Sequence, residues 1–180
     1  DGLLTITGGK LTTFRSMAED LLIKIEEQKL FQGIERKKDF SKQRYLISLD
    51  KQDWLDKLKD LDIQLEDDIT DHLYQQYGRG AIEIINTIVK EPALGERIVD
   101  GNDFIKAEIL YVLRYELTTH LIDVFRRRTE MSLFIDHRKS PEVAEIVADL
   151  MAKEYSWGEK KKKIEIRHYL EYVKKTVSFI

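Results

Sequence analysis

The residue types with the clearest chemical use stand near the start of the chain, where a glycine-rich turn precedes a helical pattern. They are Thr7, Gly8, Gly9, Lys10, Leu11 and Thr12. Paired glycines let the backbone approach a ligand closely, because no Cβ stands in the way. A helix that begins behind them offers unpaired N–H groups and a partial positive charge, which favour an electron-rich oxygen, and Lys10 adds a full charge. The pattern predicts an anion or polar-ligand corner, although an ordinary glycine turn leading into a helix has the same spacing.

The turn differs from the common nucleotide-binding motifs. It matches neither the dinucleotide fingerprint G-x-G-x-x-G nor the phosphate loop that ends in Gly-Lys-Ser/Thr. Two flanking elements must position it. Residues 3–7 predict a short strand, and from Leu11 to about Gln28 apolar residues recur at helical spacing. The glycines would therefore lie at a strand-to-helix turn.

The rest of the chain is predicted to be helical. Mixed charges around Gly33 indicate a solvated connector, and the apolar period beyond it is almost entirely that of a helix. We therefore predict three segments: residues 1–30 with the strand and first helix, a linker over 31–50, and an α-helical domain over 51–180.

Several residues mark where the helices of this domain should begin and end. Asp50 is a plausible N-cap and Gly78 a natural stop, whereas Asp103 is expected to cap a long stretch through Leu117. Further helices are predicted over 121–128, from Ser140-Pro141 onward, and over about 159–177.

Composition excludes several classes of protein. The chain has 180 residues, a formal net charge of −3 and no cysteine. The acidic balance argues against a nucleic-acid binder, and the lack of cysteine excludes disulfides and thiol catalysis. No apolar run approaches the roughly 20 residues that span a bilayer. The first residue is Asp1 rather than methionine, from which we expect a C-terminal piece of a longer protein.

Histidines and arginines are the remaining candidates for a site. His72, His120, His137 and His168 show no i, i+3 or i, i+4 pair, so no metal site is predicted and each is interpreted as a surface or capping residue. In one interpretation the run 126–128 would form a phosphate or nucleic-acid patch. In the other, which we favour, Arg114 or Arg127 forms ion pairs between helices with Glu116, Glu108 or Asp123.

Four consecutive lysines, residues 160–163, begin the last predicted helix. We interpret them as a solvated face. Attraction to anionic lipid is a weaker alternative, and the acidic neighbours Glu159, Glu165 and Glu171 oppose it.

Two regions of the sequence, one near its start and one made of three blocks further on, resemble one enzyme family. The run 2–15 resembles the last flavin-contacting segment of the FAD-dependent glycerol-3-phosphate dehydrogenases and the related α-glycerophosphate oxidases. The blocks 77–81, 107–117 and 121–129 resemble the helical C-terminal domain of the same enzymes, in the same order. The implied fold is mainly α, a helical C-terminal cap domain preceded by a short β-strand plus helix that belong to the FAD domain.

The resemblance also implies roles for the first turn. Thr7, Gly8, Gly9, Lys10, Leu11 and Thr12 would lie along the flavin ring, with helix-start N–H groups facing its C2 carbonyl oxygen. Donors fixed there favour the reduced flavin. Lys10 would also bind the substrate, because a glycerol phosphate dianion needs cationic partners. No catalytic residue is assigned within this chain.

The parent enzyme would oxidise sn-glycerol 3-phosphate to dihydroxyacetone phosphate and pass electrons through FAD to a membrane quinone or to O2. The expected location is the cytoplasm, with peripheral attachment to the inner face of the cell membrane left open. The piece alone is expected to be inactive. The alternative is a non-catalytic helical protein-interaction domain whose exposed apolar surface could also form a homodimer. Residues 1–28 discriminate between the two hypotheses, because they should belong to the core of a self-contained interaction domain.

Overall fold

The computed structural model of the protein describes residues 3–29 and 49–178. The chain divides into two compact units, Asp1–Tyr45 and Leu46–Ile180. The predicted linker over 31–50 lies almost entirely outside the described residues, so its path stays a prediction.

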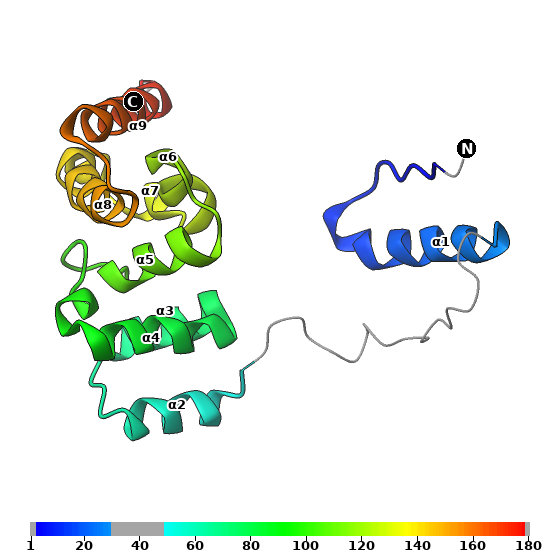
Figure 1. Ribbon diagram of the computed structural model, residues 1–180, viewed down its shortest axis with the longest axis horizontal. Coiled ribbons are helices and arrows are strands. Elements are labelled where there is room, and N and C mark those ends of the chain that lie inside the picture. Colours follow the sequence, from blue (N-terminus) through cyan, green and yellow to red (C-terminus); the bar gives the residue numbers. More distant parts are fainter. Residues whose placement is uncertain (1–2, 30–48, 179–180) are drawn as a thin grey trace. The chain divides into compact units, whose positions relative to one another are not determined.

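The first unit contains one long helix preceded by an irregular segment (Figure 1). A short 3-10 helix, η1 (Leu11–Thr13), leads directly into α1 (Phe14–Glu27). Within this unit α1 has no buried residue, although its apolar side chains share one face as predicted. Met17, Leu21 and Ile25 are half-buried.

The strand predicted over residues 3–7 is not formed. Residues 3–10 have no regular secondary structure, and none of the residues that the structure describes belongs to a strand. A strand is stabilised by its hydrogen-bonded neighbour, and the first unit offers none along its described length. The β-prone composition was therefore insufficient to specify a strand by itself.

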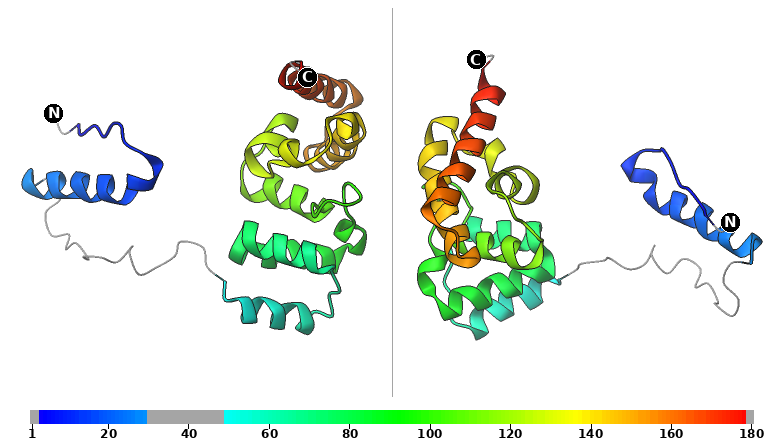
Figure 2. Two further views of the ribbon diagram at one scale, coloured as in Figure 1. Left: turned by 180° about the vertical axis from the view of Figure 1, so that it is seen from behind. Right: turned by 45° about the horizontal axis from the view of Figure 1, so that its top comes forward.

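The second unit is a stack of helices (Figure 2). The longer ones are α2 (Lys51–Asp60), α3 (Asp67–Tyr77), α4 (Ala81–Lys90), α5 (Lys106–Tyr115), α8 (Ser140–Tyr155) and α9 (Glu159–Val177). Between α5 and α8 lie the short α6 (Leu121–Asp123), the π-helix η5 (Val124–Arg128) and α7 (Met131–Phe134). Three 3-10 turns connect the elements: η3 (Gly78–Gly80), η4 (Pro92–Gly95) and η6 (His137–Lys139).

Successive helices pack on one another, α2 on α4, α4 on α5, α5 on α8 and α8 on α9. Their apolar faces form one core. Its fully buried members include Trp54, Leu73, Ile84, Ile109, Val147 and Met151. The predicted helical domain is thus confirmed as a mainly α structure.

Most predicted helix ends are correct. The Asp50 carboxylate accepts the Gln52 N–H at 2.8 Å and caps α2. Gly78 ends α3 with a φ of 50°, a backbone conformation that glycine adopts without strain. The prediction for α5 is wrong: the N-cap is Ile105 rather than Asp103, and Glu108 accepts the Ile105 N–H at 2.8 Å. An acidic residue three positions inside a helix can reach back in this way, and the apolar N-cap concealed it.

Candidate functional site

The double-glycine turn has a backbone conformation that requires glycine. Gly8 and Gly9 have φ angles of +80° and +92°. A Cβ on Gly9 would lie 2.7 Å from Met17 Sδ and 3.1 Å from Thr13 Oγ1, whereas a Cβ on Gly8 would meet nothing within 4 Å. One side of the turn therefore packs on its own helix and the other is open to a ligand.

The helix behind the turn begins with its N–H groups free of side-chain caps. Lys10 is the N-cap of η1, and its carbonyl oxygen accepts the Thr13 N–H at 2.9 Å and the Thr13 hydroxyl at 2.7 Å. Neither η1 nor α1 has an acidic residue in its first turn. The positive end of the helix is thus not neutralised locally.

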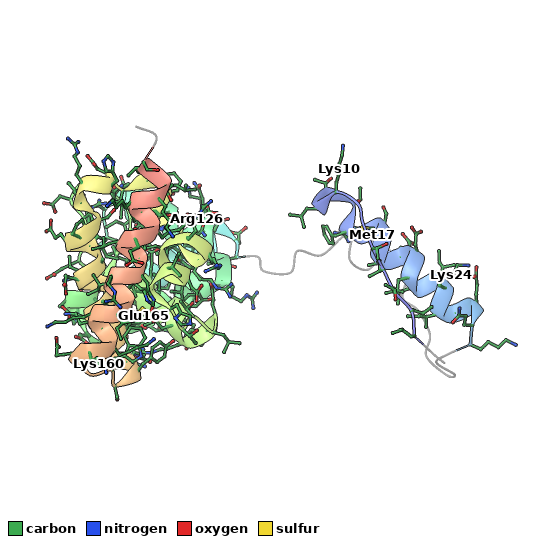
Figure 3. All side chains as sticks on the ribbon, turned by 90° about the horizontal axis from the view of Figure 1, so that it is seen from above. Lys10, Met17, Lys24, Arg126, Lys160 and Glu165 are labelled. Carbon is green, nitrogen blue, oxygen red and sulfur yellow. The ribbon has the colours of Figure 1, made fainter. Side chains whose placement is uncertain are left out.

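All six predicted site residues, Thr7 to Thr12, are exposed. Figure 3 shows Lys10 at the N-terminal end of the helix, with its side chain directed away from it. Among residues 3–29 and 49–178, no acidic side chain pairs with Lys10. The segment therefore presents backbone donors and one unpaired cation on the same exposed turn, which suits an electron-rich ligand.

Comparison with known proteins decides the family. The model of the C-terminal domain of alpha-glycerophosphate oxidase matches residues 6–162, which include the whole glycine turn and the helical unit up to the beginning of α9. The chain belongs to this family. The resemblance identified from the sequence is thereby confirmed.

Curated relatives of this C-terminal domain carry one name. A probable mitochondrial glycerol-3-phosphate dehydrogenase of Dictyostelium discoideum is 31% identical over 179 residues, which cover 98% of this chain and 27% of that protein. The mitochondrial glycerol-3-phosphate dehydrogenase of Bos taurus is 31% identical over 187 residues, which cover 95% of this chain and 24% of that protein. The mitochondrial glycerol-3-phosphate dehydrogenase SDP6 of Arabidopsis thaliana is 28% identical over 185 residues, which cover 96% of this chain and 29% of that protein. The chain thus spans about a quarter of the length of these relatives. No solved structure matches it significantly.

A buried carboxylate joins three parts of the helical domain. Glu108 on α5 is completely buried, and its Oε2 lies 2.7 Å from His72 Nε2 on α3. The other ring nitrogen of His72 lies 3.4 Å from Asp103. Burial alone would lower the pKa of His72, but the two carboxylates outweigh it and the pKa is raised. His72 is therefore a structural link between α3 and α5, not the surface or capping residue predicted for it.

A second buried carboxylate, Glu165 of α9, caps α6. It accepts the Leu121 N–H at 3.1 Å, lies 3.1 Å from His120 Nδ1 and pairs with Lys161. Burial would raise the pKa of Glu165, but these three partners lower it. The sequence contains a signal for this role, because Glu165 stands between Ile164 and Ile166. An acidic residue on an apolar face needs a partner.

The arginines of this region form ion pairs, as the favoured interpretation predicted. Arg127 pairs with Asp123 one turn away, and Arg128 lies 3.7 Å from Glu116. Arg114 instead makes two hydrogen bonds of 2.7 Å to Glu154 of α8. Of these pairs, Arg114–Glu154 joins α5 to α8 and Arg128–Glu116 joins η5 to the end of α5, whereas Arg127–Asp123 lies within one turn.

Within the part of the chain that the structure describes, no group of three His, Asp or Glu side chains is placed to hold a metal ion. None of the helices described is both long and apolar enough to cross a membrane.

Proposed function

We propose that this chain is part of an FAD-dependent enzyme that oxidises sn-glycerol 3-phosphate to dihydroxyacetone phosphate. The exposed double-glycine turn at an uncapped helix start carries the proposal, since it lies within the family match. The names of the relatives support the substrate.

The residues present fit a flavin. The open side of Gly8 allows a flat ring to approach the backbone, and the first N–H groups of η1 are donors suited to a carbonyl oxygen that becomes more negative on reduction. When bound, FAD supplies the acceptor for the substrate's hydride. Thr7, Gly8 and Gly9 would line the ring, while Leu11 and Thr12 would donate their N–H groups.

Lys10 would stabilise the charge that develops on reduction and attract the phosphate of the substrate. Arg15, one turn further on, has a buried Nη1 with no hydrogen-bond partner among the described residues. A buried guanidinium nitrogen needs an acceptor, which supports a contact between Arg15 and another part of the enzyme.

Residues 1–180 alone should neither retain FAD nor turn over substrate. No G-x-G-x-x-G motif, which would hold the ADP part of FAD, occurs in the printed sequence. The final electron acceptor is a membrane quinone or O2. We place the enzyme in the cytoplasm, at the inner face of the membrane if the acceptor is a quinone.

The test uses the full-length parent purified with its flavin. Flavin reduction by glycerol 3-phosphate is followed without oxygen, then turnover is measured with O2 and with a quinone analogue. Lys10→Ala should slow flavin reduction about 100-fold. Lys24→Ala is the matched control, because Lys24 lies on the same helix but is occupied by Glu27. Peroxide yield distinguishes the two acceptors.

A parent that binds no flavin, or whose flavin ignores this substrate, would overturn the proposal. The second candidate, a helical protein-interaction domain, would then take its place. It is favoured by exposed apolar side chains in the helical unit, such as Leu117 at 88% and Phe134 at 64% exposure. Against it, no residue of α1 is fully buried within its unit, whereas an element of a self-contained core would bury one face.

A further inference from the structure

The last helix carries a charge opposite to that of the whole chain. α9 has seven Lys or Arg residues against three Glu, a formal charge of +4, whereas the chain carries −3. The family match ends at residue 162. Most of α9 therefore lies beyond the matched residues. The positive charge of this helix has to be explained from the contacts and exposure of its own side chains.

The structure removes part of the acidic counter-charge from the surface of α9. Glu165 is turned inward to His120 and Leu121, and it also occupies Lys161. Lys162 is likewise held, by Glu145 at 3.0 Å and Asp149 at 2.5 Å. In Figure 3, Glu165 lies in the first half of α9, with Lys160 near the beginning of the helix.

Five cations on α9 remain exposed. In the described part of the chain none of them has an acidic partner. They are Lys160, Lys163, Arg167, Lys174 and Lys175. At 1.5 Å per residue they extend over roughly 20 Å of helix. Their side chains are long and flexible, and over this length of helix they do not converge on one small ligand.

Three of these cations border a shallow groove of about 370 Å³. Its lining includes the cations Lys163, Arg167 and Lys174 together with the apolar Ile166 and Leu170. The acidic members of the lining are Glu145, already bound by Lys162, and Glu171. The groove thus combines cationic with apolar side chains.

A phospholipid surface matches both features. Anionic headgroups attract a cluster of basic residues on a helix, with about 1 kcal/mol, or roughly fivefold in affinity, for each residue near the surface. Headgroups move laterally, so flexible lysines need no fixed complementary shape. An acidic protein would have to match the 20 Å row of cations in rigid geometry.

We propose that the outer face of α9 binds anionic phospholipid, with headgroup phosphates on Lys163, Arg167 and Lys174 and apolar contact at Ile166 and Leu170. The inference rests on the proposed function only for the presence of the parent at a membrane. Its test contains neither flavin nor substrate, so failure of one is distinguishable from failure of the other.

The experiment measures co-sedimentation of the full chain with vesicles of phosphatidylglycerol and phosphatidylcholine, and with vesicles of phosphatidylcholine alone. Binding to the anionic vesicles should fall about 100-fold when Lys163→Gln, Arg167→Gln and Lys174→Gln are combined, at about fivefold for each charge. The control combines Lys57→Gln, Lys59→Gln and Lys90→Gln, which remove the same charge from α2 and α4 and should leave binding within about threefold. Circular dichroism establishes that all three proteins are folded alike.

The proposal would be overturned by absence of vesicle binding, by equal binding to both vesicle types, by retention of binding in the α9 triple variant, or by equal loss in the α2–α4 control. The last would indicate attraction by net charge alone. Absence of vesicle binding together with capture of an acidic protein would assign the surface to a protein partner instead.

Discussion

His72 and Glu108 form the closest link between α3 and α5, with 2.7 Å between Nε2 and Oε2. The other oxygen of Glu108 accepts the Ile105 N–H at the start of α5. One completely buried carboxylate therefore both caps its own helix and holds a neighbouring one. Since a protonated imidazole donates from both nitrogens, charged His72 can satisfy Glu108 and Asp103 together, whereas neutral His72 can donate to only one.

Stability of the helical unit should fall as pH rises through the pKa of His72. That pKa is raised above its ordinary 6.5 in the folded state, so its contribution is complete below pH 6.5 and is lost as pH rises through the folded value. Thermal unfolding of the chain at a series of pH values checks this. His72→Gln should be less stable at pH 6.5 and should show a flatter profile above it. A wild-type curve parallel to that of His72→Gln would contradict the assignment.

The sequence predicted the helices better than the links between them. Caps and stops such as Asp50 and Gly78 are local, because the residue and the backbone it serves lie within a few positions. The Arg127–Asp123 pair could be anticipated for the same reason. His72 and Glu108 are 36 positions apart, so no spacing rule connects them. Their partnership follows only once α3 packs beside α5.

The candidate site shows the same division. The glycines at positions 8 and 9 predicted a turn, and in the structure both have a positive φ, a conformation that glycine adopts readily. The strand predicted before the turn is not formed over residues 3–7, because strand formation depends on a partner outside the local sequence. The flavin and substrate contacts of Thr7 to Thr12 stay predictions, since no contact among the described residues tests them.

Replacement of Glu165 by glutamine should loosen α6 from α9. Glutamine keeps an oxygen that can accept the buried Leu121 N–H, but it loses the charge that strengthens this hydrogen bond and the pair with Lys161, so the free energy of unfolding should fall by about 1 kcal/mol. Amide exchange at Leu121 should accelerate more than exchange in α2. Glu171→Gln is the control, because Glu171 lies exposed on the same helix and should change stability by less than about 0.5 kcal/mol. Equal effects of the two substitutions would show that Glu165 contributes only its charge.

Gly80 is required for space rather than for its backbone angle. Its φ is −63°, but a Cβ would lie 2.3 Å from the Tyr111 hydroxyl oxygen and 2.9 Å from Cζ. Gly80→Ala should therefore destabilise the helical unit by about 1–3 kcal/mol in chemical denaturation. Gly158→Ala meets nothing within 4 Å and should change stability by about 1 kcal/mol or less. Addition of Tyr111→Phe should recover part of the Gly80→Ala loss, because it removes the nearest atom. Failure to recover any would place the strain elsewhere.

A methyl group on Gly8 should weaken flavin binding without a matching loss of stability. Gly8 has a φ of +80° and Gly101 one of +81°, and a Cβ on either would meet nothing within 4 Å. Alanine at both positions thus imposes the same backbone strain, about 1–2 kcal/mol. Only Gly8 lies on the proposed flavin-facing side of the turn. In the full-length parent, Gly8→Ala should lower flavin affinity at least about tenfold, as measured by equilibrium dialysis, whereas Gly101→Ala should leave it unchanged. Equal affinities in the two variants would separate the turn from the cofactor and remove the observation that carries the proposed function.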